Sequence, residues 1–149
     1  MPEDVASSVR TVPVRFLEAD MPDERFERGM LVRRAVLGEE HVDRAQAGTT
    51  EFTRDFQELI TRYAWGEIWS RPGLERKTRS LLTIAITASL GRLEELRLHV
   101  RGARNTGVTR DEVKEVLLHV AVYAGVPAAN SAFAAAAALY REIDEEERS

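Results

Sequence analysis

The most constraining feature of the sequence is the stretch Leu81–Leu90, which has apolar side chains almost all the way round a helical wheel. Its polar side chains are the small hydroxyls of Thr83, Thr87 and Ser89. A helix without a polar face is expected to be covered by other elements on every side. We therefore expect residues 74–90 to form the central helix. The apolar stretch is too short to span a bilayer, so it predicts no membrane contact.

Helical periodicity continues on both sides of this stretch, and no segment alternates with the period of a strand. The predicted helices begin near Pro22, Glu39, Thr49 or Thr50, Leu74, Arg92, Thr109 and Pro127. The acids of Asp144–Glu147 lie where the helix macrodipole disfavours them, so the C-terminal end is expected to fray. The sequence predicts an all-α bundle of six or seven helices in one domain, residues 22–149. Residues 1–21 would be an arm, either laid on the body or flexible.

Composition excludes several classes of function. The chain has 149 residues and a net charge of −4, which argues against a non-specific nucleic-acid binder. It contains no cysteine, so disulfides, thiolate metal sites and a cysteine nucleophile are excluded. Such a chain suits a reducing cytoplasm. The N-terminus carries Glu3 and Asp4 and no apolar run, so we expect no signal peptide.

The segment Arg92–Asn105 carries the ionisable trio Arg92, Glu95 and His99 on one side of a predicted helix. The trio borders the apolar stripe, the position from which side chains line a cleft between helices. Glu95 could orient His99 and hold its pKa near neutrality for proton transfer. The spacing alone fits a helical ion pair at least as well. A Glu–His pair is a weak metal signal, and no metal site is predicted.

Other candidate residues have ordinary structural interpretations. Trp65, Trp69 and Tyr63 would usually be core aromatics. The nearby arginines would usually form a solvated face, yet beside a cleft they can clamp carboxylates. These are Arg71, Arg76 and Arg79, with Lys77 among them. His119 is expected to pack, and His41 to be exposed to solvent.

The sequence resembles the carboxymuconolactone decarboxylase family, part of the AhpD-like superfamily. The resemblance covers about residues 25–133 and is carried by the segments 63–74, 79–80, 94–99, 107–112 and 123–130, including EIWSRPGL. Alkylhydroperoxidase-type members carry a CxxCxxxH motif, whose histidine falls on His99. The two cysteine positions fall on Arg92 and Glu95, and the preceding acidic position falls on Ser80. Without thiolates, cysteine-based peroxidase activity is excluded.

The resemblance implies cofactor-free decarboxylation of 4-carboxymuconolactone to the β-ketoadipate enol-lactone and CO2, in protocatechuate catabolism. The lactone serves as the electron sink, so neither metal nor organic cofactor is required. His99 would transfer the proton, oriented by Glu95. Arg71, Arg79 or Arg92 would hold carboxylate or enolate charge, and Trp69 would exclude water.

Two other functions stay open at this point. One is a related cofactor-free lyase or hydrolase that acts on another small lactone or carboxylate. The other is a non-catalytic oligomeric binding protein of the same fold. The resemblance also implies a homo-oligomer, a trimer or hexamer, and the alanine-rich run 134–138 suits close subunit packing.

Overall fold

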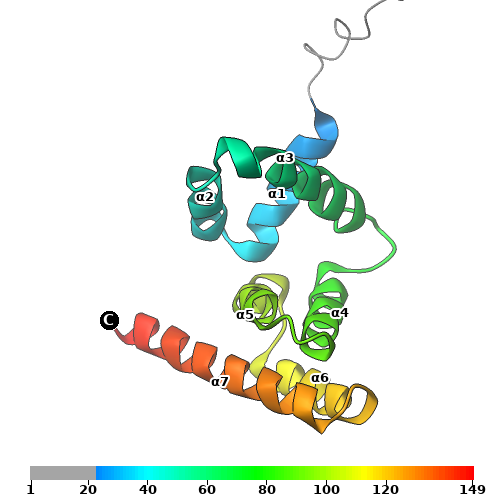
Figure 1. The fold of residues 1–149 in the computed structure, drawn as a ribbon, viewed down its shortest axis with the longest axis vertical. Helices are drawn as coiled ribbons and strands as arrows, with labels where there is room; N and C mark the ends of the chain where they lie inside the picture. Colours follow the sequence, from blue (N-terminus) through cyan, green and yellow to red (C-terminus); the bar gives the residue numbers. More distant parts are fainter. Residues whose placement is uncertain (1–22) are drawn as a thin grey trace, which may run out of the picture.

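The computed structural model describes residues 23–149, and every regular element in that range is a helix (Figure 1). The elements are α1 (Glu24–Leu37), α2 (Glu39–Ala47), α3 (Glu51–Ile60), the π-helix η2 (Thr61–Ile68), α4 (Arg76–Ser89), α5 (Leu93–Gly102), the 3₁₀ turn η3 (Ala103–Thr106), α6 (Arg110–Tyr123) and α7 (Val126–Arg148). The all-α prediction is confirmed. The arm predicted for residues 1–21 lies outside the described residues.

Local sequence signals explain most helix boundaries. The Asp23 carboxylate accepts a hydrogen bond from the Phe26 N–H and begins α1. Thr109 and Glu112 form the capping box expected at the start of α6. Gly38 follows α1 with a φ of 94°, a conformation that glycine adopts without strain. The segment predicted as one helix from Arg92 to Asn105 instead becomes α5 followed by η3, with Arg92 as the N-cap residue.

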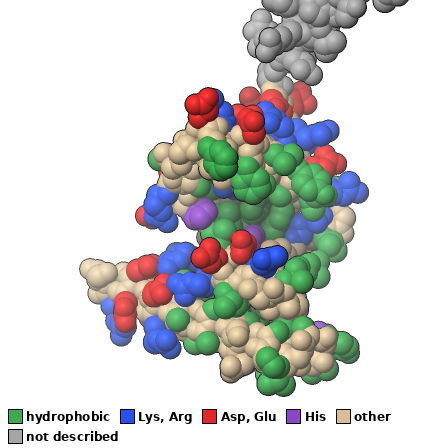
Figure 2. Space-filling view, viewed as in Figure 1, with side chains coloured by type: hydrophobic (Ala, Val, Ile, Leu, Met, Phe, Trp, Pro, Cys, Tyr) green, Lys and Arg blue, Asp and Glu red, His purple; other side chains and the backbone are tan. Residues whose placement is uncertain are grey.

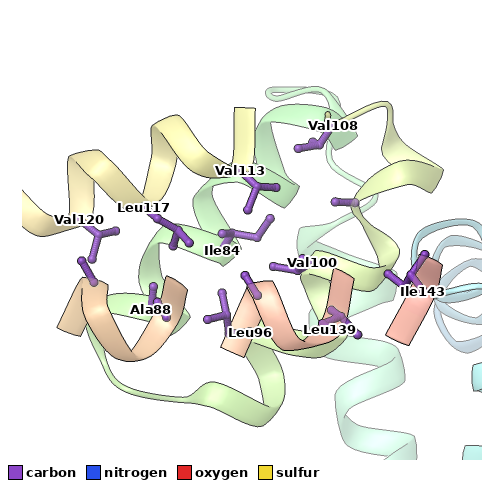
Figure 3. Packing of buried hydrophobic residues seen from close by; sticks show 14 residues of the cluster. Ile84, Ala88, Leu96, Val100, Val108, Val113, Leu117, Val120, Leu139 and Ile143 are labelled. Carbon is purple, nitrogen blue, oxygen red and sulfur yellow. The ribbon is translucent and has the colours of Figure 1, made fainter. Parts of the chain in front are cut away.

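The larger hydrophobic core lies among α4, α5, α6 and α7 (Figure 3). Ile84, Leu96, Leu117 and Leu139 are almost completely buried there, each from a different helix. Small residues of α7, such as Ala132, let that helix approach its neighbours closely. This core is aliphatic, and it fixes the position of α5.

A smaller core lies among α1, α2 and η2, and Leu98 of α5 packs against it. Here α1 and η2 touch through glycines. A Cβ added to Gly29 would lie 2.1 Å from the Thr61 carbonyl oxygen, and one added to Gly66 would lie 2.2 Å from the Arg25 carbonyl oxygen. Helix α5 therefore lies between the two cores and contributes to both (Figure 1).

Within a single chain, the expectation that the apolar helix is covered on every side is wrong. In α4 one face, with Ile84 and Ala88, is buried, whereas Ile86 is 56% exposed and Leu82 and Leu90 are also exposed. The reason is that α5, α6 and α7 pack against α4 without enclosing it, which leaves the face with Leu82 and Ile86 uncovered. No helix within residues 23–149 is both long enough and apolar enough to cross a membrane.

The expectation that the C-terminal end frays is also wrong, since α7 continues to Arg148. Its acids pair with arginines of neighbouring elements: Glu142 with Arg97, Glu146 with Arg101, Glu147 with Arg104, and Asp144 with Arg110. These pairs offset the unfavourable macrodipole. Each exposed pair contributes little, at most about 1 kcal/mol.

Candidate active site

The side chain of His99 lies against two tryptophan rings. Its ring centroid is 6.2 Å from that of Trp65 and 6.0 Å from that of Trp69, with interplanar angles of 18° and 14°. The tryptophan rings are themselves 5.0 Å apart. Figure 2 shows histidine atoms next to a group of hydrophobic side chains, between the upper and lower parts of the molecule. His99 thus occupies an aromatic, largely dry environment at the junction of the two cores.

Burial lowers the pKa of His99 to about 4. Loss of solvation is the main cause, the Glu95 charge works in the opposite direction, and His41 lowers the pKa further. The expectation that Glu95 holds this pKa near neutrality is therefore wrong. Glu95 is exposed, and no hydrogen bond joins it to His99 in the described range, so its charge is screened by water. At neutral pH His99 is an uncharged imidazole in the unliganded protein.

The π-helix η2 places both tryptophans. The Trp69 N–H donates to the Ala64 carbonyl at 2.9 Å, five residues back, in place of the α-helical four. π-Helical turns are rare and occur frequently at functional sites. Trp65 is buried in the smaller core, and Trp69 is half-buried beside it. Of the three aromatics expected in the core, Trp65 and Trp69 pack there, whereas Tyr63 is exposed.

Trp69, which lies beside His99, also lines a cavity that contains an arginine side chain. Together with Arg79 it lines a cavity of about 160 Å³, whose other walls are Ile68, Leu82 and Thr83. The Arg79 Nε is buried without a hydrogen-bond partner in the described residues, while its Nη2 donates to the Arg71 carbonyl at 3.1 Å. A buried N–H without an acceptor costs free energy, which an anionic ligand would recover. Arg79 is therefore the predicted arginine that the structure best supports.

The other two predicted arginines are less well connected. The Arg71 guanidinium lies 3.9 Å from the Glu67 carboxylate, and its side chain is 62% exposed. The Arg92 side chain is exposed, with no ion pair or hydrogen bond to another described residue. No hydrogen bond or ion pair joins Arg71 or Arg92 to His99 in the described range, so their substrate-binding roles stay predictions.

Two residues of α1 and α2 were missed by sequence reasoning. His41 is half-buried rather than solvent-exposed, and burial together with the Arg33 charge lowers its pKa. Its charge also lowers the pKa of His99. Arg33 is buried, and its position in the apolar stripe of α1, between Met30 and Leu37, was the available signal.

Two further observations concern Ser80 and the expectation that the protein holds no metal. Ser80, at the superfamily's acidic position, is buried, and its hydroxyl lies 2.7 Å from that of Thr106. It therefore holds η3 against α4. Within residues 23–149 no group of three or more metal-ligating side chains is brought together. The metal-free reaction stays a prediction.

Comparison with known proteins identifies the class. The family model of the carboxymuconolactone decarboxylase family matches residues 54–138. The chain is 50% identical over 121 residues to 4-carboxymuconolactone decarboxylase of Acinetobacter baylyi, which covers 81% of this chain and 90% of that protein. It is 53% identical over 102 residues to nitrosuccinic acid decarboxylase of Metarhizium robertsii, covering 68% and 71%. This chain belongs to the carboxymuconolactone decarboxylase family.

Proposed function

We propose that the protein decarboxylates 4-carboxymuconolactone to the β-ketoadipate enol-lactone and CO2. The likeness to the Acinetobacter baylyi enzyme over most of both chains supports this reaction. The observation that carries the chemistry is His99, stacked beside Trp69, which in turn lines a cavity with the unpartnered Nε of Arg79. This arrangement offers a proton-transfer group and a cation for the substrate's carboxylates.

The reaction places clear demands on the site. Cleavage of the carbon–carboxylate bond releases CO2 and leaves the electron pair in a dienolate that extends to the lactone carbonyl. A proton then adds at the carbon next to that carbonyl. The lactone holds the electrons, so the proposed mechanism requires no cofactor. Arg79 stabilises negative charge, and Trp65 and Trp69 keep water away from the leaving carboxylate.

His99 supplies the proton in this proposal. The imidazole is neutral in the unliganded protein because its pKa is about 4. A substrate with two carboxylates brings negative charge into the same dry site and raises that pKa. His99 then takes up a proton on binding and transfers it to the dienolate carbon. The charge of Glu95 favours the protonated form in the same direction.

The direct test is a decarboxylation assay on 4-carboxymuconolactone in the presence of EDTA. We expect loss of the lactone's ultraviolet absorption together with release of one CO2 per substrate. Absence of turnover with folded protein would contradict the proposal, and turnover abolished by EDTA but restored by a metal would contradict the cofactor-free mechanism.

A second substrate is tested in the same assay because of the Metarhizium robertsii relative. Nitrosuccinic acid would also place a leaving carboxylate near an electron-withdrawing group, so the same residues could serve it. A higher kcat/KM for nitrosuccinic acid than for the lactone would favour the alternative of a related lyase. Binding of both without turnover would favour a binding protein.

We also propose that the protein works as a homo-oligomer, a trimer or hexamer, in the cytoplasm. Leu82 and Tyr123 line one cavity of about 560 Å³ between α4 and α6, and both are exposed, as is the neighbouring Ile86. A large exposed apolar surface is typical of an interface. Light scattering should give a mass several times that of one chain, and Ile86→Glu should lower it. A monomeric wild-type protein would contradict the oligomer.

A further inference from the structure

A second polar cavity lies between α1, the end of α2 and α3. Its volume is about 240 Å³. The residues that line it are Phe26, Met30, Arg33, Gln46, Thr49, Arg54, Gln57, Glu58 and Thr61. His99, Trp65, Trp69 and Arg79 are not among them, so this cavity is separate from the candidate active site.

The cavity contains a buried cation without a counter-charge. Arg33 is only 6% exposed, and in the described residues it forms no ion pair with a carboxylate. Its Nη atoms donate to neutral oxygens, those of the Gln57 amide at 3.2 Å and the Thr61 hydroxyl at 3.4 Å. Its Nε has no partner in the described range. Buried charges in proteins are normally paired, so this arginine lacks an anion.

Around Arg33, hydrogen-bond donors also outnumber the acceptors. A guanidinium only donates, so the Gln57 oxygen must face it, and the Gln57 NH₂ group is left to donate elsewhere. Arg54 lines the same cavity and forms no ion pair within residues 23–149. The acid that lines the cavity, Glu58, is already bound by Arg62 at 3.1 Å.

We propose that this cavity binds a small organic dianion, such as a short dicarboxylate, with Arg33 and Arg54 as its charge partners. The Gln57 amide supplies a further hydrogen bond. Phe26 and Met30 provide an apolar wall against which a short hydrocarbon chain can pack. Arginine suits this role because its planar guanidinium matches the geometry of a carboxylate.

Isothermal titration of the full chain with succinate tests the site. We expect saturable binding with one succinate per chain, and acetate should bind at least tenfold more weakly because it has one charge. Gln57→Glu is the decisive variant. It keeps the side-chain length but places a carboxylate beside Arg33, so succinate affinity should fall at least tenfold while thermal stability is kept. Arg54→Gln should also weaken binding, whereas Arg141→Gln, an exposed arginine of α7, should leave it unchanged.

His99→Ala separates this site from the candidate active site, because it should bind succinate as the wild-type protein does. Loss of succinate binding in His99→Ala would place the ligand in the active site and overturn the proposal. Undetectable binding to the wild-type protein, or an affinity unchanged by Gln57→Glu, would also overturn it. None of these outcomes depends on turnover, so the proposed decarboxylation is tested independently.

Discussion

The two hydrophobic cores of this molecule differ in what they bury. The core of α4–α7 is built from aliphatic side chains and alanines. The smaller core of α1, α2 and η2 contains Trp65, and the buried Arg33 and Thr61 belong to the same helices. Helix α5 joins them, with Leu96 and Val100 facing the first and Leu98 the second.

This difference separates stability from chemistry. An aliphatic core contributes free energy of folding through burial alone. Polar groups that lose solvation without full compensation, such as the half-buried His99 and the buried Arg33, cost free energy and are typical of functional positions. The aliphatic core of α4–α7 therefore holds α5 in place. The smaller core of α1, α2 and η2 provides the dry environment of the His99 imidazole.

The largest expected effect is on turnover, from a substitution of His99 at the junction of the two cores. His99→Ala should lower kcat about 10²–10⁴-fold, the usual contribution of a positioned acid–base group. The measurement is steady-state decarboxylation with folding checked by circular dichroism. His119 of α6 is exposed, so the expectation that it packs is wrong, and His119→Ala is the matched control that should keep wild-type kcat. A folded His99→Ala protein within tenfold of wild type would exclude His99 as the proton-transfer residue.

The next largest expected effect is on stability, from a substitution in the larger core that lies away from the candidate active site. Leu117 is completely buried among α4–α7. Leu117→Ala should lower the free energy of unfolding by about 2–5 kcal/mol, through lost burial and the cavity left behind. Urea unfolding measures this change, and kcat per folded molecule should stay near wild type. Leu31→Ala, at a leucine that is 71% exposed, should change stability by less than about 1 kcal/mol. Equal losses in both variants would contradict the assigned core.

The third effect is a dependence of stability on pH that comes from His99. Its pKa is about 4 in the folded protein and about 6.5 when unfolded. Between these values the unfolded chain binds more protons, so stability is highest above pH 6.5 and falls as pH decreases towards 4. The loss should approach about 3 kcal/mol for this one group.

Chemical unfolding of wild type and His99→Gln at pH 7, 6, 5 and 4 isolates this contribution, because other acid-titrating groups are shared. The stability of wild type relative to His99→Gln should fall by about 3 kcal/mol as pH decreases from 6.5 to 4. Glu95→Gln should lower the pKa of His99 slightly further, measurable by NMR titration. Parallel stability curves for wild type and His99→Gln would show that His99 is not desolvated.

The smallest effect concerns the contact between α1 and η2. Gly29→Ala places a Cβ against the Thr61 carbonyl, so the helices must separate, which should cost about 1–3 kcal/mol. Because Trp65 lies in η2 and Trp69 directly follows it, their fluorescence should also change. Gly48→Ala is the control, since its added Cβ would meet nothing closer than 3.4 Å. Unchanged stability and fluorescence in Gly29→Ala would contradict the close packing of these helices.

The sequence by itself determined the local architecture and the family. Apolar periodicity, the capping box at Thr109 and Glu112, and glycine stops predicted the helices because these signals act over a few residues. The resemblance around EIWSRPGL and His99 identified the family, and the matched family model confirms it. The sequence could not show that one face of α4 is left uncovered within the chain. Coverage of a helix depends on the side against which its neighbouring helices pack.

Only the tertiary structure decided the electrostatics of the site. His99 loses its solvation to Trp65 and Trp69, and Glu95, one turn away on the same helix, cannot offset that loss. Helix spacing shows which charges are near in sequence, but desolvation comes from elements distant in the chain. The same reason applies to Arg33. Its sequence position placed it on a face of a helix, but its burial without a counter-charge depends on α3 and η2, which contribute its neighbours Gln57 and Thr61.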